Sequence, residues 1–225
     1  MKIKKIFKNI EKISKHPIKQ LISMFKNIIY VKGNNNALII AGKKIKFYQF
    51  VQTKIKGNNN IVEFCGSVSR IKNVFILIEG NNNHIKIGET NGSIHDLYVN
   101  MKGNDNSLNI GKNFSCGKTT FTIYNGSNTN IGNNCTLASE ISIWTTDGHY
   151  IYDKDNSIMN LEKDVNIGNH VWICDNCTIL KGSCIDDNCV LGNSSILTKN
   201  YKDNQNCVIV GSPAKIIKNE INWGC

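Results

Sequence analysis

The amino-acid sequence predicts an all-β solenoid, in which short strands stack turn upon turn. Two periodic patterns support this class. In the first half of the 225-residue chain a glycine that opens an asparagine-rich stretch returns every 23 or 24 residues, and in the second half an aliphatic residue returns every six. Fixed periods of this kind are typical of stacked repeats, because a single repeat cannot bury its apolar face alone.

The N-terminal segment differs from the rest of the chain in its charge. Of the net charge of +10, residues 1–32 supply +8, and the remaining residues carry eighteen basic and sixteen acidic side chains. Apolar residues at helical spacing on both sides of Pro17 predict a basic, amphipathic helical extension over residues 1–31. The extension either packs on the body or on a partner subunit, or lies on an anionic membrane; a disordered tail is the third alternative. The nearly neutral body argues against binding of nucleic acid.

The sequence contains no run of eighteen apolar residues and no visible secretory signal. A membrane-spanning helix needs about 20 apolar residues, so none is expected. We therefore expect a cytoplasmic protein, peripheral on the inner face of the membrane if residues 1–31 bind lipid.

Residues 32–125 are organised by the asparagine-rich repeat. Asparagine and glycine tolerate the left-handed backbone conformation that a corner requires, so each repeat is predicted to form one turn of a coil. Equivalent asparagines are predicted to stack into a hydrogen-bonded ladder, for example Asn34, Asn58, Asn81 and Asn104. The glycines that define the repeat are Gly33, Gly57, Gly80, Gly103 and Gly126.

From residue 126 to residue 212 the period shortens to six. A smaller residue stands two positions before each aliphatic residue of the second run, which predicts three short strands per turn with the large side chains inside and the small ones near the corners. The aliphatic positions are Ile131, Leu137 and Ile143, then Ile167, Ile173, Ile179, Ile185, Leu191 and Leu197; the small ones are Val165, Val171, Cys177, Ser183, Cys189 and Ser195.

The nine cysteines fit this coil as small apolar residues. Cys135, Cys177, Cys189 and Cys207 fall at or near the small positions. Since the number of cysteines is odd and a cytoplasmic protein is expected, we interpret them as reduced and structural.

Two long stretches carry a resemblance to a known family. "VNIGNHVWICDNCTILKGSCIDDNCVLGNSSILTKN" and the later "VIVGSPAKIIK" resemble the left-handed β-helix acyltransferases with hexapeptide repeats, and "DGHYIYD" is most similar to bacterial polysaccharide O-acetyltransferases, including those acting on sialic-acid capsules. The resemblance covers residues 126–218. It implies a left-handed parallel β-helix, ended by a cap at 213–225, that transfers an acetyl group from acetyl-CoA to a sugar hydroxyl. Three flat faces per copy favour a homotrimer.

Residues 144–164 break the six-residue pattern, although Ile143 and Ile167 are four hexads apart and the pattern resumes in frame. A stack of flat coils has no cleft, so a protruding catalytic loop packed against a neighbouring subunit is expected. His149 lies in this loop. Histidine accepts a proton near neutral pH, and we interpret His149 as the general base that deprotonates the acceptor hydroxyl. The alternative is a solvated loop histidine.

The resemblance assigns further residues. Trp172 is predicted to face outward and to work beside His149 at the acceptor or the pantetheine arm, or else to be buried at a subunit interface. Ser194 replaces the second glycine of the family's Gly-x-Gly-Ser-x-x-Thr-Lys pattern, and Lys199 is expected to reach a CoA phosphate. Cys174 replaces a usual glycine and is expected to narrow the pantetheine path. The segment flanking the adenine end, which also serves to cap the coil, contains Gly211, Pro213, Ala214 and Lys215.

Several alternatives remain open from the sequence. The related β-helix carbonic anhydrases hold zinc with three histidines; His149 and His170, the latter predicted to be exposed, offer two, but no third follows, so no metal is expected. The favoured activity is O-acetylation of a capsule or lipooligosaccharide sugar. The runner-up is N-acetylation of a nucleotide-linked amino sugar, although the N-terminal space for a sugar-nucleotide domain is filled by coils. The third possibility is a non-enzymatic β-helix scaffold.

Overall fold

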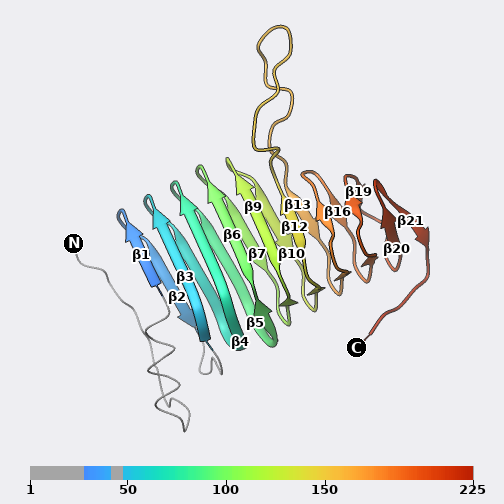
Figure 1. Cartoon of the computed structure of the whole chain (residues 1–225), viewed down its shortest axis with the longest axis horizontal. Coiled ribbons are helices and arrows are strands. Elements are labelled where there is room, and N and C mark those ends of the chain that lie inside the picture. The colour runs from blue at the N-terminus through green and yellow to red at the C-terminus, as the bar shows by residue number, and fades with distance from the viewer. Residues whose placement is uncertain (1–27, 42–47, 225) are drawn as a thin grey trace.

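The computed structural model describes residues 28–41 and 48–224, which form a parallel β-helix (Figure 1). Every element in these ranges is a strand, which confirms the predicted all-β solenoid. No helix in this part of the chain has the length and apolar character needed to cross a bilayer. The predicted helical extension falls mainly on residues outside the described ranges. Residues 28–31 lie in strand β1 (Ile28–Lys32), so the coil begins before the boundary predicted at residue 32.

The strands form three parallel stacks, one on each face of the coil. The first face contains β1, β3 (Tyr48–Lys56), the end of β4 (Ile61–Glu79), β6 (Leu97–Lys102), β9 (Thr119–Tyr124), β12 (Ile141–Trp144), β15 (Thr178–Ile179) and β18 (Ile196–Leu197). The second contains β2 (Ala37–Ala41), the start of β4, β5 (His84–His95), β7 (Ser107–Ile110), β10 (Asn128–Ile131), β13 (Val165–Ile167), β16 (Cys184–Ile185) and β19 (Asn200–Tyr201).

The third face is short and closes the coil. It contains the end of β5, then β8 (Ser115–Cys116), β11 (Thr136–Leu137), β14 (Trp172–Ile173), β17 (Val190–Leu191) and β20 (Val208–Gly211). Strand β21 (Ala214–Lys218) turns back and pairs antiparallel with β20. This hairpin covers the open end of the coil.

The asparagine-rich corners form hydrogen-bonded ladders, as predicted. Asn34, Asn58 and Asn81 each donate their backbone N–H to the side-chain oxygen of the next equivalent asparagine, at 2.8–2.9 Å. A second ladder joins residues with positive φ, from Asn35 to Asp105. A third ladder is formed by the last asparagine of each triplet; it begins at the half-buried Asn36 and continues through the buried Asn60, Asn83 and Asn106.

The core is one continuous column of aliphatic side chains. Both sets of hexad positions point inward: the aliphatic residues from Ile131 to Leu197 and the small residues from Val165 to Ser195 are at most 4% exposed. Burying an aliphatic side chain of this size contributes about 1.5–3 kcal/mol, so the column is the main source of stability. The predicted placement of large and small residues is confirmed.

The number of residues per turn of the coil decreases from the N-terminal to the C-terminal end. Paired residues are 23 or 24 apart in the first coils, 21 or 22 apart between β6 and β12, and 18 apart from β13 to β18. The step between β10 and β13 is 36, because Asn130 pairs with Asn166. Since 36 is twice 18, an insertion of 18 residues enters one corner and leaves the register of the coil intact.

Candidate active site

Among the connections between strands that the structure describes in full, the insertion between β12 and β13 is the one that projects far from the coil (Figure 1). Its two ends are joined at the coil, where the Lys163 N–H donates to the Thr145 carbonyl at 3.0 Å. Thr145 is buried, and its Oγ1 accepts a hydrogen bond of 2.6 Å from Ser127. The two ends of the loop are therefore held together and anchored to the coil.

His149 lies near this base and is exposed. Its carbonyl accepts a hydrogen bond of 2.9 Å from the Asn160 side chain, which comes from the returning arm of the loop. Within the described residues, no hydrogen bond reaches the imidazole nitrogens. The ring is thus free to accept a proton from a bound molecule.

Lys181 supports the loop from the corner one coil further on. Its Nζ lies 2.6 Å from Asp147 Oδ2, two residues before His149, and its side chain is only 15% exposed. The hydrogen bond from the Lys181 ammonium lowers the pKa of the Asp147 carboxyl, and the hydrogen bond from Asn160 acts in the same direction. Asp147 therefore remains an ionised carboxylate beside the charged ammonium of Lys181. Neither Lys181 nor Asn160 was singled out from the sequence.

Trp172 faces outward from β14 and is 39% exposed, as predicted. Two rings that the sequence did not link to Trp172, those of Trp223 and His170, lie near it. Trp223 from the C-terminal tail lies 6.0 Å from Trp172 between ring centroids and stacks on His170 at 4.1 Å. Trp223 also donates its indole N–H to the His170 carbonyl at 2.9 Å.

His170 corrects one expectation from the sequence. It was predicted to be exposed, but the Trp223 ring covers it and its Nδ1 lies 3.0 Å from Asn188 Oδ1. Its φ of 52° places it in the left-handed region at the same corner as Asn188. A lone tryptophan in the polar stretch "NEINWGC" was the only signal in the sequence that this tail folds back on the coil.

A single chain does not bring His149 and Trp172 together. The loop leaves at the end of β12, on the first face, whereas Trp172 lies on β14, on the third face. Among the described contacts, none joins the two residues.

The residues predicted to hold CoA divide between two corners. Ser194 lies at the corner between β17 and β18, and the Gly211 N–H reaches the same corner by donating to Ser195 Oγ at 3.0 Å. Pro213 and Ala214 follow in the β20–β21 hairpin, and Lys215 is exposed on β21. Lys199 lies beyond β18, at the next corner.

Backbone geometry explains the family's glycine at position 194. Ser194 has a φ of 55°, a conformation that glycine adopts without strain. Here the Ser194 side chain accepts a hydrogen bond of 3.2 Å from Asn176, which occupies the equivalent corner of the previous coil. Cys174 has an ordinary φ, so the backbone accepts a side chain there; it is half-buried.

The sequence also contains a Cys-x-x-Cys spacing, Cys174 to Cys177, a pattern that could in principle bind a metal or form a redox pair. Both thiols are free, and Cys177 points into the core. Burial raises the pKa of the Cys174 thiol to about 11 and raises the pKa of Cys177 as well. Such thiols are poor nucleophiles and poor metal ligands, since thiolate is the reactive form. Within the described residues, no three His, Cys, Asp or Glu side chains are grouped closely enough to hold a metal ion.

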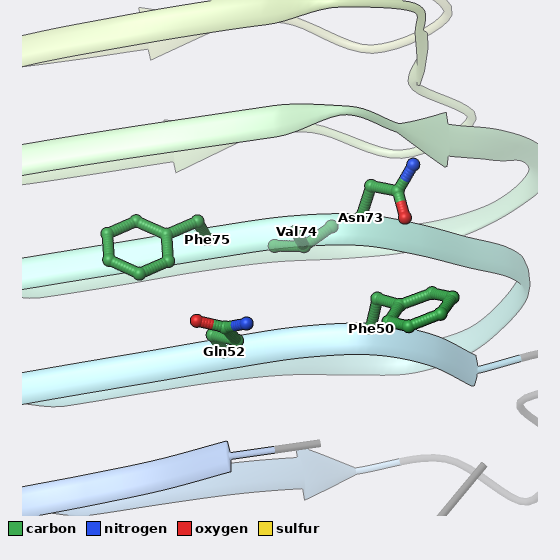
Figure 2. Close-up of a pocket in the computed structure, with 5 residues that line it drawn as sticks. All are labelled: Phe50, Gln52, Asn73, Val74 and Phe75. Carbon is green, nitrogen blue, oxygen red and sulfur yellow. The ribbon is translucent and has the colours of Figure 1, made fainter. Parts of the chain in front are cut away.

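A shallow hollow of about 300 Å³ lies on the outer side of β3 and β4 (Figure 2). It holds no titratable side chain and is separated from β12 by β6 and β9. It therefore offers no acid–base chemistry to the loop. Its lining residues are Phe50, Gln52, Asn73, Val74 and Phe75.

Comparison with known proteins places these features in context. Residues 164–199 match the family model described as bacterial transferase hexapeptide (six repeats). A polysialic acid O-acetyltransferase of Escherichia coli O1:K1 / APEC is 34% identical over 97 residues, which is 43% of this chain and 31% of that protein. A polysialic acid O-acetyltransferase of Neisseria meningitidis is 39% identical over 109 residues, which is 48% of this chain and 50% of that protein. The matched segments thus span half or less of these curated relatives.

Two solved structures are similar over nearly the whole chain. The polysialic acid O-acetyltransferase OatWY is 34% identical with a TM-score of 0.61, covering 88% of this chain and 92% of that one. The polySia specific acetyltransferase NeuO is 26% identical with a TM-score of 0.77, covering 89% and 90% of the two chains. The similarity therefore includes the asparagine-rich coils as well as the hexads.

Proposed function

The chain belongs to the bacterial hexapeptide-repeat transferases, and on this premise we propose that it transfers an acetyl group from acetyl-CoA to a hydroxyl of an acidic capsule polysaccharide. The single observation that carries this activity is the 18-residue insertion, which holds a solvent-accessible histidine on an otherwise smooth coil. The likeness of the whole coil to polysialic acid O-acetyltransferases supports the class of acceptor.

His149 is the general base in this proposal. Its neutral imidazole takes the proton of the sugar hydroxyl while the hydroxyl oxygen bonds to the thioester carbon. The tetrahedral intermediate then breaks its carbon–sulfur bond, and the CoA sulfur leaves with the proton that His149 returns. General base catalysis of this kind contributes about 10²–10⁴-fold to the rate.

Two lysines near the end of the coil are suited to the phosphates of acetyl-CoA. Lys199 and Lys215 are exposed and make no ion pair with any residue that the structure describes. Gly211, with a φ of 113°, and Ser194 lie at the neighbouring corner, along which the pantetheine arm would run. Lys199 and Lys215 would bind the phosphate groups as point charges.

A homotrimer completes the site in this proposal. The loop exposes six large apolar side chains, 38–67% accessible, more than an isolated loop usually presents to water: Tyr150, Ile151, Tyr152, Ile158, Met159 and Leu161. We propose that they pack on a neighbouring copy and bring His149 toward the neighbour's Trp172.

Light scattering tests this assembly. The wild type should have three times the chain mass of 25.2 kDa. Changing Met159 and Leu161 together to lysine should yield monomers, because two charges would be buried in the interface. Ile217→Lys, equally exposed on β21, is the matched control and should remain trimeric. A fully active monomer would contradict the proposed assembly.

The test of the activity measures CoA thiol release with acidic capsule polysaccharides, neutral glycans and a nucleotide-linked amino sugar. Transfer to the acidic polymer should fall at least about 10²-fold in His149→Ala, since the general base is lost. His84→Ala is the control, because it makes the same chemical change on a distant coil. The proposal fails if the folded His149 variant keeps more than a tenth of the wild-type rate, or if only the nucleotide-linked sugar is acetylated.

A further inference from the structure

A partly buried cation, Lys181, ties the His149 loop to the coil, together with Asn125, which donates to Tyr150 Oη and to Glu162. Lys181 Nζ lies 2.6 Å from Asp147 Oδ2, 2.6 Å from the Asn160 carbonyl and 3.1 Å from the Leu161 carbonyl. An ammonium group has three donors, and all three are used. One acceptor belongs to the outgoing arm of the loop and two belong to the returning arm, so Lys181 ties both arms to the next coil.

Asn160 carries this constraint to His149. Its side-chain nitrogen donates to Asp147 Oδ2 at 2.8 Å and to the His149 carbonyl at 2.9 Å. Its side-chain oxygen accepts the Ile151 N–H at 2.6 Å. The amide therefore holds the backbone on both sides of Tyr150. Gly148 is fixed from the other side, because its N–H donates to Thr146 Oγ1 at 3.0 Å.

We propose that Lys181 and Asn160 are positioning residues, which set where the His149 imidazole lies relative to the acceptor hydroxyl. This inference rests on the proposed role of His149 as the base. A general base must come within about 3 Å of the proton it removes, and a misplacement of about 1 Å can cost about 10²-fold in rate. Since no described group holds the imidazole itself, its position depends on the backbone that these two side chains fix.

Comparison with the next coil separates this role from ordinary corner chemistry. Ile179 pairs with Leu197, so Lys181 and Lys199 occupy equivalent positions one coil apart. Lys199 is exposed and holds no loop, whereas Lys181 is largely covered and fully bonded. The contacts that Lys181 makes are therefore not needed to turn this corner, and the loop accounts for them.

Steady-state kinetics with Lys181→Met and Asn160→Ala provide the test. Each variant should lower kcat about 10- to 100-fold while the KM for acetyl-CoA stays within about twofold, because the proposed CoA contacts lie on other coils. Lys181→Arg should recover part of kcat, since it keeps the charge near Asp147. Lys112→Met, which removes a surface ion pair with Glu89, is the matched control and should leave kcat unchanged.

Two further measurements keep the outcome decisive. Limited proteolysis should cut the loop of Lys181→Met faster than that of the wild type while the coil stays intact. The double variant Lys181→Met/Asp147→Asn should lose no more activity than Lys181→Met alone, because the two side chains act as one unit.

The outcomes distinguish this inference from the proposed function. Wild-type kcat in both Lys181→Met and Asn160→Ala, with an inactive His149→Ala, would overturn the positioning role and leave the general base in place. An active His149→Ala would overturn the proposed function itself. A uniform loss of thermal stability, with kcat restored on cooling, would show that Lys181 serves the fold alone and would also overturn the inference.

Discussion

In the asparagine-rich coils, equivalent residues are 23 or 24 positions apart and one strand, β4, runs for 19 residues; in the hexad coils they are 18 apart and most strands have two residues. The first region fixes its corner with three asparagine ladders, one of them buried. The second places small inward residues near its corners, and its corner hydrogen bonds, such as those from Asn133 to Asn169 and from Asn169 to Asp187, lie on the outside of the coil. The difference shows that the larger turn adds a buried ladder to the exposed ones, whereas the smaller turn is filled by close packing.

The two regions also differ in charge. Residues 33–125 have eleven basic and five acidic side chains, and residues 126–225 have seven basic and eleven acidic ones. The nearly neutral body inferred from the whole sequence is therefore the sum of a basic and an acidic region. The basic region is the one suited to an acidic polymer, and the loop with His149 belongs to the other region.

The largest effect is expected from removing the loop of the hexad region. Deleting residues 146–163 and changing Asp164 to Gly leaves a three-residue corner like that at 180–182 of the next coil. Transfer should fall by at least about 10²-fold, since the base is removed, and denaturant unfolding should show a change of stability below about 1 kcal/mol, because no core residue is lost.

Deleting residues 58–60 is the counterpart in the other region. It removes a member of all three ladders and should unfold the coils around it; equal stability of the two variants would contradict the comparison.

A smaller effect is expected inside the buried ladder. Asn83→Ala leaves the buried Asn106 N–H and the Gly103 carbonyl without a partner, and each such group costs about 1–3 kcal/mol. We expect a loss of about 3 kcal/mol in the free energy of unfolding, measured by chemical denaturation. Asn81→Ala, in the outer ladder of the same coil, should cost less than about 1 kcal/mol, because water replaces the exposed hydrogen bonds that the Asn81 side chain makes with Asn58 and Asn104. Equal losses would mean that burial of the ladder is unimportant.

The smallest effects compare two outward aromatic stacks, one in each region. Phe75 and Tyr98 stack at 5.3 Å in the first region, and Trp223 and His170 stack at 4.1 Å in the second. Trp223→Ala should raise the acceptor KM about 2- to 10-fold, because an aromatic contact is worth about 0.5–1.5 kcal/mol and Trp223 lies beside Trp172. Phe75→Ala should leave the acceptor KM of a short oligosaccharide unchanged. The reverse pattern would show that the acceptor binds on the first region.

The periodic parts of this fold could be predicted from the sequence, because every turn repeats the same requirement. Asn34 to Asn104 stack as expected, and Ile167 to Leu197 point inward as expected. The contacts of the candidate site could not be predicted in the same way. Lys181 reaches Asp147 across 34 positions, and Trp223 reaches His170 across 53, through segments that do not repeat. His149 was found through its family motif, whereas its support depends on how the coils stack.

The asparagine ladders have a direction along the coil axis. In the second ladder each side-chain nitrogen donates toward the C-terminal end, and the last member, Asp105, only accepts. Asn73 likewise donates to Asp96, and Asn169 donates to Asp187. Asparagine suits the inner rungs because it both donates and accepts, whereas an ionised aspartate suits only the final rung. The second ladder is thus a row of aligned amide dipoles that ends in a negative charge, whereas the buried third ladder runs the opposite way, because Asn60, Asn83 and Asn106 each donate toward the N-terminal end.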